Sequence, residues 1–298
     1  MTRRAPLPEG IEPERFLARD ARAAGSTSDR LRAADLSRPF WGVRTARPAE
    51  STADRCRALA LRLPAEGCFS HSTAAILFGA PLPSRLEGAP GLHVTVPRGQ
   101  RAMDAAGVVG HQLTLSDSDV GTVLGLPVTK PARTWCDLAS LLSLAELVAV
   151  GDHLLGRGAP LVSRHELAAA SVRYASSRGA RTRRAALPLL SARAESPAES
   201  RLRVLLVTAG YADLVVNEPV YDKAGRFLAR PDLRFRHVPV ILEYEGDHHR
   251  SDKAQWRKDI ARVERLQSHG WHVVRVTADD LANPSALLRR LRSLLSQL

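Results

Sequence analysis

The chain has 298 residues, 44% of them hydrophobic, which is enough for two or three domains with buried cores and excludes disorder throughout. Its 43 Lys and Arg residues against 31 Asp and Glu residues give a formal net charge of +12. This balance favours a polyanionic partner, because basic side chains release the counterions of phosphates on binding. A generally arginine-rich proteome is the alternative explanation.

The three cysteines, Cys56, Cys68 and Cys136, lie far apart and form no C-x-x-C pair, which argues against a disulfide framework or a zinc ribbon. We expect each to be a small buried side chain. The first residues are charged, and no apolar run approaches about eighteen residues. We therefore predict a soluble, cytoplasmic protein with no membrane partner.

Residues 12–47 predict a degenerate winged helix-turn-helix. Apolar residues at helical spacing are followed by a small polar break, a second helix at about 28–36 and a basic strand at 40–44. Arg30 and Arg32 on the second helix are candidate DNA contacts. A small helical cap that does not touch DNA is the alternative. The segment resembles the truncated winged-helix head of AbiEi-type antitoxin proteins.

Residues 48–160 predict an α+β domain that resembles the middle part of the same antitoxin-like proteins. The expected helices are 52–63, 69–78, one from Pro131, and 144–155, and the expected extended segments are 92–97, 111–113 and 126–129. Four histidines here, at positions 71, 93, 111 and 153, are far apart in sequence. Because ligand sets usually show a recognisable spacing, we predict no metal site among them.

Residues 161–195 predict a basic helical connector, interrupted by glycines and prolines. Its densest cluster of charge is Arg178, Arg181, Arg183 and Arg184. A charge run is usually a solvated face, but this one precedes a group of carboxylates, where phosphates would have to be held. We predict that these arginines contact nucleic acid.

Residues 196–298 predict a third domain with the element order α-β-β-β-α-β-α. A capping box formed by Ser196 and Glu199, with Pro197 at the first helical position, begins the domain. The expected elements are a helix ending before Gly210, strands at 214–220, 226–235 and 238–244, a helix at 252–268, a strand at 271–276 and a helix at 283–298.

Five motifs in this domain stand in a fixed order. They are Ser196-Pro197-x-Glu199, Pro231-Asp232-Leu233, Glu243-Tyr244-Glu245-Gly246-Asp247-His248-His249-Arg250, Trp256-x-x-Asp259-x-x-Arg262 and Gly270-Trp271-x-x-x-Arg275. Over about residues 196–280 they resemble the PD-(D/E)XK nuclease superfamily, most closely the very-short-patch-repair-endonuclease-like domains of actinobacterial proteins. The resemblance implies a restriction-endonuclease-like α/β fold, an αβββαβα core around a central mixed sheet.

Carboxylates gathered at adjacent strand ends suit a hard divalent cation. The resemblance assigns Asp232 and Glu243 as ligands of Mg2+, with Mn2+ as a substitute and the main-chain carbonyl of Tyr244 as a third ligand. Glu199 matches a helix glutamate that often completes such sites. Its alternative role is capping alone.

The chain departs from the superfamily at Glu245, where a lysine is expected. Glu245 could act as a base or a ligand, with His248 or His249 moving protons, because imidazole titrates near neutrality. Arg250, Lys253 or Arg257 would then supply the missing positive charge and contact DNA. A polar loop without catalytic function is the alternative for the histidines. We further expect an ion pair between Asp259 and Arg262, and Arg275 either touches the phosphate or neutralises the carboxylates.

These features predict a Mg2+-dependent endodeoxyribonuclease or nickase that is targeted to DNA by the antitoxin-like N-terminal region. The first alternative is a non-catalytic DNA-binding regulator or antitoxin with a degenerate nuclease fold, which the absent lysine favours. The second is an interaction module for a toxin partner encoded elsewhere. The oligomeric state stays open.

Overall fold

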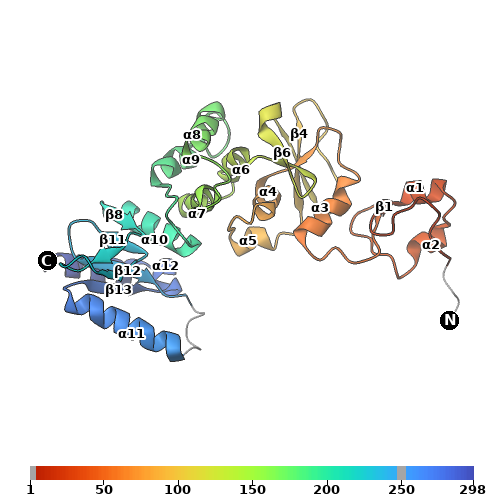
Figure 1. The fold of residues 1–298 in the computed structure, drawn as a ribbon. Coiled ribbons are helices and arrows are strands. Elements are labelled where there is room, and N and C mark those ends of the chain that lie inside the picture. The colour runs from red at the N-terminus through yellow and green to blue at the C-terminus, as the bar shows by residue number, and fades with distance from the viewer. Residues whose placement is uncertain (1–4, 247–252) are drawn as a thin grey trace. The chain divides into compact units, whose positions relative to one another are not determined.

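The computed structural model describes residues 5–246 and 253–298 (Figure 1). The chain forms two compact units, Met1–Leu138 and Ala139–Leu298, called here the first and the second unit. The boundary differs from the predicted limits at 160 and 195, since the helix that follows Ser143 belongs to the second unit. No helix in the described ranges is long and apolar enough to cross a membrane.

The first unit begins with a small α+β part. Its elements are β1 (Phe16–Leu17), α1 (Ala18–Ala23), α2 (Ser28–Arg32) and β2 (Val43–Arg44). Strands β1 and β2 pair antiparallel, and the Thr27 hydroxyl caps α2 by accepting a hydrogen bond from the Arg30 amide at 3.2 Å. The predicted order of helix, turn, helix and strand is therefore present, although the second helix ends at Arg32 rather than at Leu36.

A five-stranded mixed sheet with the order β5-β4-β3-β7-β6 forms the rest of the first unit. Its elements are α3 (Thr52–Ala60), β3 (Cys68–Phe69), α4 (His71–Leu77), α5 (Ser84–Glu87), β4 (Leu92–Pro97), β5 (Val108–Leu113), β6 (Val120–Val123), β7 (Leu126–Thr129) and α6 (Pro131–Leu138). Leu59, Phe69, Val94 and Val128 lie fully or almost fully buried in its core. All three cysteines are buried thiols, as predicted.

The second unit begins with packed helices: α7 (Leu144–Leu155), α8 (Arg164–Arg173), α9 (Ala180–Ala186) and α10 (Pro197–Thr208). Helix α7 packs against both α9 and α10, so the basic segment at 161–195 is part of a folded unit rather than a linker. Buried Asp152 on α7 accepts hydrogen bonds from the Ser191 amide and the Ser200 hydroxyl, both at 2.6 Å, and pairs with Arg203. These contacts join α7 to α10.

A four-stranded mixed sheet follows, in the order β13-β12-β11-β8. Its strands are β8 (Leu214–Val216), β11 (Leu233–Phe235), β12 (Val240–Tyr244) and β13 (His272–Val276), and the remaining helices are α11 (Lys253–Ser268), α12 (Ala278–Ala282) and α13 (Ser285–Leu295). One face packs on Leu206 of α10 and Leu291 of α13. The opposite face places Ile241 against Leu266 of α11.

Two of the predicted long strands are wrong in extent. The segments 214–220 and 226–235 are each divided into two strands. The halves nearest the turn that connects the two segments form a separate hairpin of β9 (Val220–Tyr221) and β10 (Phe227–Ala229). Asn217 adopts a left-handed backbone with φ of 44°, which ends β8. Pro231 has no amide hydrogen for a ladder and precedes β11. The sheet is thus shorter than predicted, and its strand ends lie beside Asp232.

Candidate functional site

Asp232 and Glu243 lie on one face of the second-unit sheet. Leu233 pairs with Leu242 in the antiparallel register, so the residue before Leu233 and the residue after Leu242 come opposite each other and share a face. The carboxylate of Asp232 accepts a hydrogen bond from the Tyr244 amide at 2.7 Å, which fixes its position at the strand end. The predicted carboxylate pair is therefore brought together by strand pairing.

The pKa of Asp232 is raised to about 6, chiefly by burial. The hydrogen bond from Tyr244 opposes this rise, and the negative charges of Glu199 and Glu243 add to it. Glu199 thus lies within electrostatic range of Asp232. Asp232, the residue before β11, is thus influenced by the charges of Glu199 on α10 and of Glu243 on β12.

Glu199 is buried and held by two donors. Its Oε2 accepts from the Glu195 amide at 2.9 Å and from the Asn217 Nδ2 at 2.6 Å. Half of the predicted capping box is present, because the Ser196 hydroxyl accepts a hydrogen bond from the Glu199 amide. The Glu199 carboxylate accepts from the amide of Glu195 instead of that of Ser196. The main-chain amide of Asn217 donates a hydrogen bond to the main-chain carbonyl of Asp232 at 3.0 Å, so Asn217 links Glu199 to Asp232.

Asn217 was not predicted as a site residue. Asn217 falls inside the strand predicted over 214–220, and the available signal was an asparagine, which tolerates the left-handed region better than most residues, within that otherwise strand-like run.

Arg262 on α11 clamps Glu243. Its two terminal nitrogens donate to the two carboxylate oxygens at 2.7 and 2.9 Å. Burial raises the pKa of Glu243, whereas Arg262 and then Arg275 lower it. We expected Arg262 to form an ion pair with Asp259 on the same helix. Its pairing with Glu243 on β12 could not be predicted from the spacing of residues along the helix.

Glu245 stands at the position where the resemblance described above leads to the expectation of a lysine. It is half exposed and pairs with Arg275 at 2.9 Å. Arg275 stands opposite Glu243 in the parallel register of β12 and β13, so it faces the same side as the carboxylates. The structure therefore favours neutralisation of the carboxylates as the role of Arg275. Arg262 and Arg275 therefore place positive charge beside Glu243 and Glu245.

Several predicted residues cannot be placed. His248, His249 and Arg250 lie outside the described residues, and so do the side chains of Lys253 and Arg257. Their predicted roles remain predictions.

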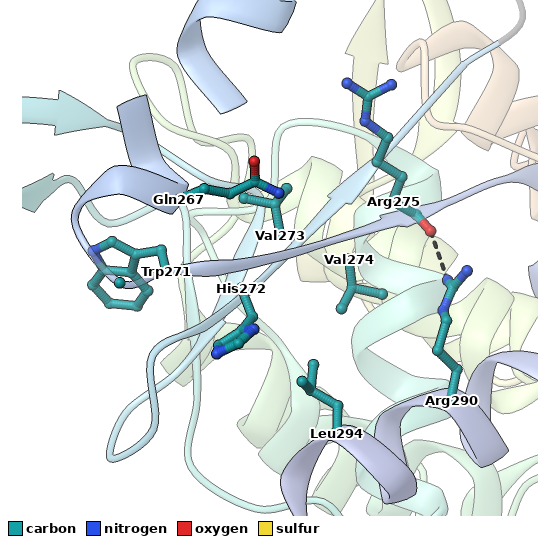
Figure 2. Close-up of a pocket in the computed structure, with 9 residues that line it drawn as sticks. Gln267, Trp271, His272, Val273, Val274, Arg275, Arg290 and Leu294 are labelled. Carbon is teal, nitrogen blue, oxygen red and sulfur yellow. Dashed lines mark hydrogen bonds between the residues drawn. The ribbon is translucent and has the colours of Figure 1, made fainter. Parts of the chain in front are cut away.

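A hollow of about 540 Å³ runs along β13, the edge strand of the sheet (Figure 2). Arg275 and Arg290 both line it. Figure 2 shows the Arg290 guanidinium directed at the main chain of β13, where Nη2 donates to the Arg275 carbonyl at 2.8 Å, while the Arg275 side chain extends away from it. The edge next to the carboxylates therefore carries positive charge.

The basic cluster predicted at 178–184 is divided by the fold. Arg183 is fully buried and donates to the Arg178 and Tyr174 carbonyls and to the Ser177 hydroxyl. Its burial removes it from the residues able to touch DNA in this fold. Arg178, Arg181 and Arg184 are exposed and remain candidates.

The two arginines predicted on the second N-terminal helix are also engaged. Arg30 forms a two-pronged ion pair with Asp35 at 3.0 and 3.1 Å and has a side chain only 11% exposed, and Arg32 pairs with Asp29 at the surface. Their pairing makes them weak candidates for phosphate contact.

A different basic surface lies close by. A hollow of about 890 Å³ includes five arginines and the side chain of Trp41, which is 84% exposed. The arginines are Arg19, Arg22, Arg38, Arg44 and Arg62. We call this the Trp41 surface. Burial lowers the pKa of Arg44, and the charges of Arg38 and Arg22 lower it further, which places these cations near one another.

Three histidines of the first unit converge, contrary to the prediction that their wide spacing excluded a ligand set. The side chains of His71, His93 and His111 offer ring nitrogens that all lie within 4.8 Å of one another. They come from the start of α4, from β4 and from β5, and only the pairing of these elements brings them together. His153, the fourth, is an exposed residue of α7 in the second unit.

Comparison with known proteins gives relatives without a stated function. No protein-family model matches the chain. Uncharacterised proteins of Mycobacterium tuberculosis strains CDC 1551 and H37Rv are each 27% identical to it over 220 residues, which cover 74% of this chain and 78% of theirs. The chain is thus similar to mycobacterial proteins along most of its length.

Proposed function

We propose that the second unit is a divalent-metal-dependent DNA nuclease or nickase. The observation that carries the proposal is the placement of Asp232 opposite Glu243 at one end of a mixed sheet, with the charge of Glu199 also acting on Asp232. Burial, and after it the charges of Glu199 and Glu243, raise the pKa of Asp232, and a bound cation would offset both effects. Carboxylate oxygens are ligands of Mg2+ and Mn2+.

The donor set fits a hard cation. Asp232 uses Oδ2 to accept from Tyr244, and Glu199 uses Oε2 for both of its hydrogen bonds. Both carboxylate oxygens of Glu243 accept hydrogen bonds from Arg262. To bind a cation, Glu243 would have to give up at least one of these hydrogen bonds. Asp232, Glu243 and the carbonyl of Tyr244 would hold the ion, which when bound would polarise a phosphoryl oxygen and lower the pKa of a water.

The chain's own residues would then position the substrate. When Glu243 turns to a cation, the guanidinium of Arg262 becomes free for a phosphate oxygen, and guanidinium matches phosphate geometry in two-pronged contacts. Arg275 lies on the same face and extends from the edge strand beside it. Exposed Arg178, Arg181 and Arg184 would hold flanking phosphates through counterion release.

The test is incubation of the purified full-length protein with supercoiled plasmid in Mg2+, Mn2+ or chelator. We expect metal-dependent nicking that Asp232→Asn and Glu243→Gln abolish and that Asp279→Asn, a change of an exposed carboxylate on α12, leaves intact. Equal nicking by wild-type and Asp232→Asn protein would overturn the assignment of the site.

A non-catalytic DNA-binding regulator or antitoxin is the second candidate, and the Trp41 surface favours it. Arginines with an exposed indole suit nucleic acid, because bases stack on the ring while guanidinium groups meet phosphates. Arg62 lies over the Trp41 ring at 5.4 Å from its centroid. A glutamate at position 245 and the closed ion pair of Glu243 also fit a site without activity.

Binding without cleavage separates the two candidates. For the regulator we expect fluorescence-measured DNA affinity that falls steeply with salt and that Trp41→Ala with Arg22→Ala weakens, while Asp232→Asn leaves it unchanged. Unchanged affinity in the Trp41 and Arg22 double variant would remove the Trp41 surface from consideration. A toxin partner is tested by copurification with proteins encoded beside this chain, and the absence of any such complex would argue against it.

A further inference from the structure

We propose that His71, His93 and His111 form a three-imidazole site in the first unit for a divalent transition-metal ion of the zinc type. The site is separate from the carboxylates of the second unit, both in chemistry and in the elements that build it. Imidazole nitrogens suit Zn2+, Cu2+ and Ni2+, whereas Mg2+ requires oxygen ligands.

The strand register places the three rings on one side of the sheet. Thr95 pairs with His111 in the parallel register of β4 and β5, and His93 lies two residues before Thr95, so His93 and His111 share a face. Helix α4 begins with His71, and hydrogen bonds lock this start to β4: the Ser70 amide donates to the His93 carbonyl at 3.0 Å, and the His93 amide donates to the Thr73 hydroxyl at 2.8 Å. The cluster is therefore fixed by backbone contacts.

The distances between the ring nitrogens are close to those of a ligand set. His93 Nδ1 and His111 Nε2 are 2.9 Å apart. Two imidazoles on one tetrahedral zinc ion would have nitrogens roughly 3.3 Å apart, given zinc–nitrogen bonds of about 2.0 Å. The rings now stack, with centroids 4.0 Å apart for His71 and His111 and 5.0 Å apart for His93 and His111. To hold an ion, the N···N contact between His93 and His111 would have to open, and the stacked rings would have to tilt so that their in-plane lone pairs point at the ion.

An outer shell already orients one of the rings. The Ser70 hydroxyl lies 2.9 Å from His71 Nδ1 and accepts a hydrogen bond from Thr95 at 2.7 Å. A proton on Nδ1 donated to Ser70 leaves the Nε2 lone pair of His71 for a metal, the arrangement that metal-binding histidines usually have.

The backbone at His71 is a second, independent observation. Its φ is 49°, in the left-handed region, which costs a non-glycine residue energy and persists where the surroundings determine it. With this backbone conformation the His71 ring stacks on the His111 ring. Strain of this kind concentrates at binding sites.

The electrostatic surroundings accept a cation. Arg133 is the nearby positive charge that acts on His71, but it is buried between Asp137 at 2.9 Å and Asp119 at 3.7 Å, so its charge is balanced. His71 and His93 are both buried, at 6% and 8% exposed. His111 lies on the edge strand and is half-buried, which gives an ion a route from solvent.

The experiment uses the full-length protein, stripped with chelator and titrated calorimetrically with Zn2+ alone. We expect one tight site that Asp232→Asn leaves intact and that His111→Ala weakens by more than about 100-fold, beyond the range of outer-shell substitutions. His165→Ala, a change of an exposed histidine on α8, is the matched control. Zinc affinity that is equal in the His111→Ala and wild-type proteins would overturn the proposal.

A direct measurement on the unaltered protein guards against misfolding of the variants. X-ray absorption at the zinc edge should show three imidazole nitrogens at about 2.0 Å, and Co2+ in place of zinc should give visible absorption bands of a low-coordinate site. A zinc shell composed of carboxylate oxygens or sulfur, or binding that Asp232→Asn removes, would place the ion elsewhere. Failure here leaves the nuclease proposal standing, because the two sites share no residue.

Discussion

Replacement of Arg262 by methionine tests whether the Glu243 ion pair holds the second unit together. The substitution keeps the apolar stem of the side chain and removes the two donors at 2.7 and 2.9 Å. Glu243 is only 9% exposed at its side chain, so it would keep a buried charge or take up a proton. Either outcome costs stability.

The size of the loss follows from burial. Loss of one partner from a buried pair typically costs about 3–5 kcal/mol. Because the Arg262 side chain is 35% exposed, solvent screening reduces the expected loss of unfolding free energy to about 2 kcal/mol. For a unit of this size that corresponds to a fall in melting temperature of about 4–8 °C.

The assay is differential scanning calorimetry of the wild type, Arg262→Met, Glu243→Gln and the double variant, in chelator. We expect the double variant to lose less than the sum of the single losses, since each single change strands the other partner. A loss below about 0.5 kcal/mol for Arg262→Met, or strict additivity, would refute the reasoning. Added Mg2+ should stabilise Arg262→Met more than the wild type, because Glu243 is then free to bind it.

Other predictions address the packing of each unit. Asp152→Ala should destabilise the second unit by about 3 kcal/mol, because Arg203 is left buried without its carboxylate, and chemical denaturation measures this loss. Gly179→Ala should cost more than Gly225→Ala in the same assay: both glycines have positive φ, but a Cβ at Gly179 would meet the Ala139 backbone at 2.4 Å, whereas at Gly225 it meets nothing within 4 Å. Equal losses for the two alanine variants would contradict the close approach. Burial raises the pKa of Cys56 to about 12, so this thiol stays protonated at pH 8, and it should resist a thiol reagent in the native protein and react once guanidinium unfolds it. Rapid native labelling of Cys56 would show that the core of the first unit opens.

The amino-acid sequence by itself determined most of the local structure. Helix caps and apolar periodicity mark α3, α7 and α10, and alternation marks β4, because these signals depend on residues within a few positions of one another. The sequence also pointed to Asp232 and Glu243, as carboxylates at strand ends and through the resemblance of their motifs, and the antiparallel register of β11 and β12 places them opposite each other.

Only the tertiary structure decided which distant side chains meet. The histidine cluster joins three elements that are separated along the chain. Arg262 on α11 pairs with Glu243 on β12. Arg183 is buried, although the charge of its segment suggested an exposed surface. Such contacts arise from strand order and helix docking, which the local pattern of polar and apolar residues does not encode. The carboxylates and Arg275 were therefore visible in the sequence, whereas the pairing of Arg262 with Glu243 and the histidine cluster were not.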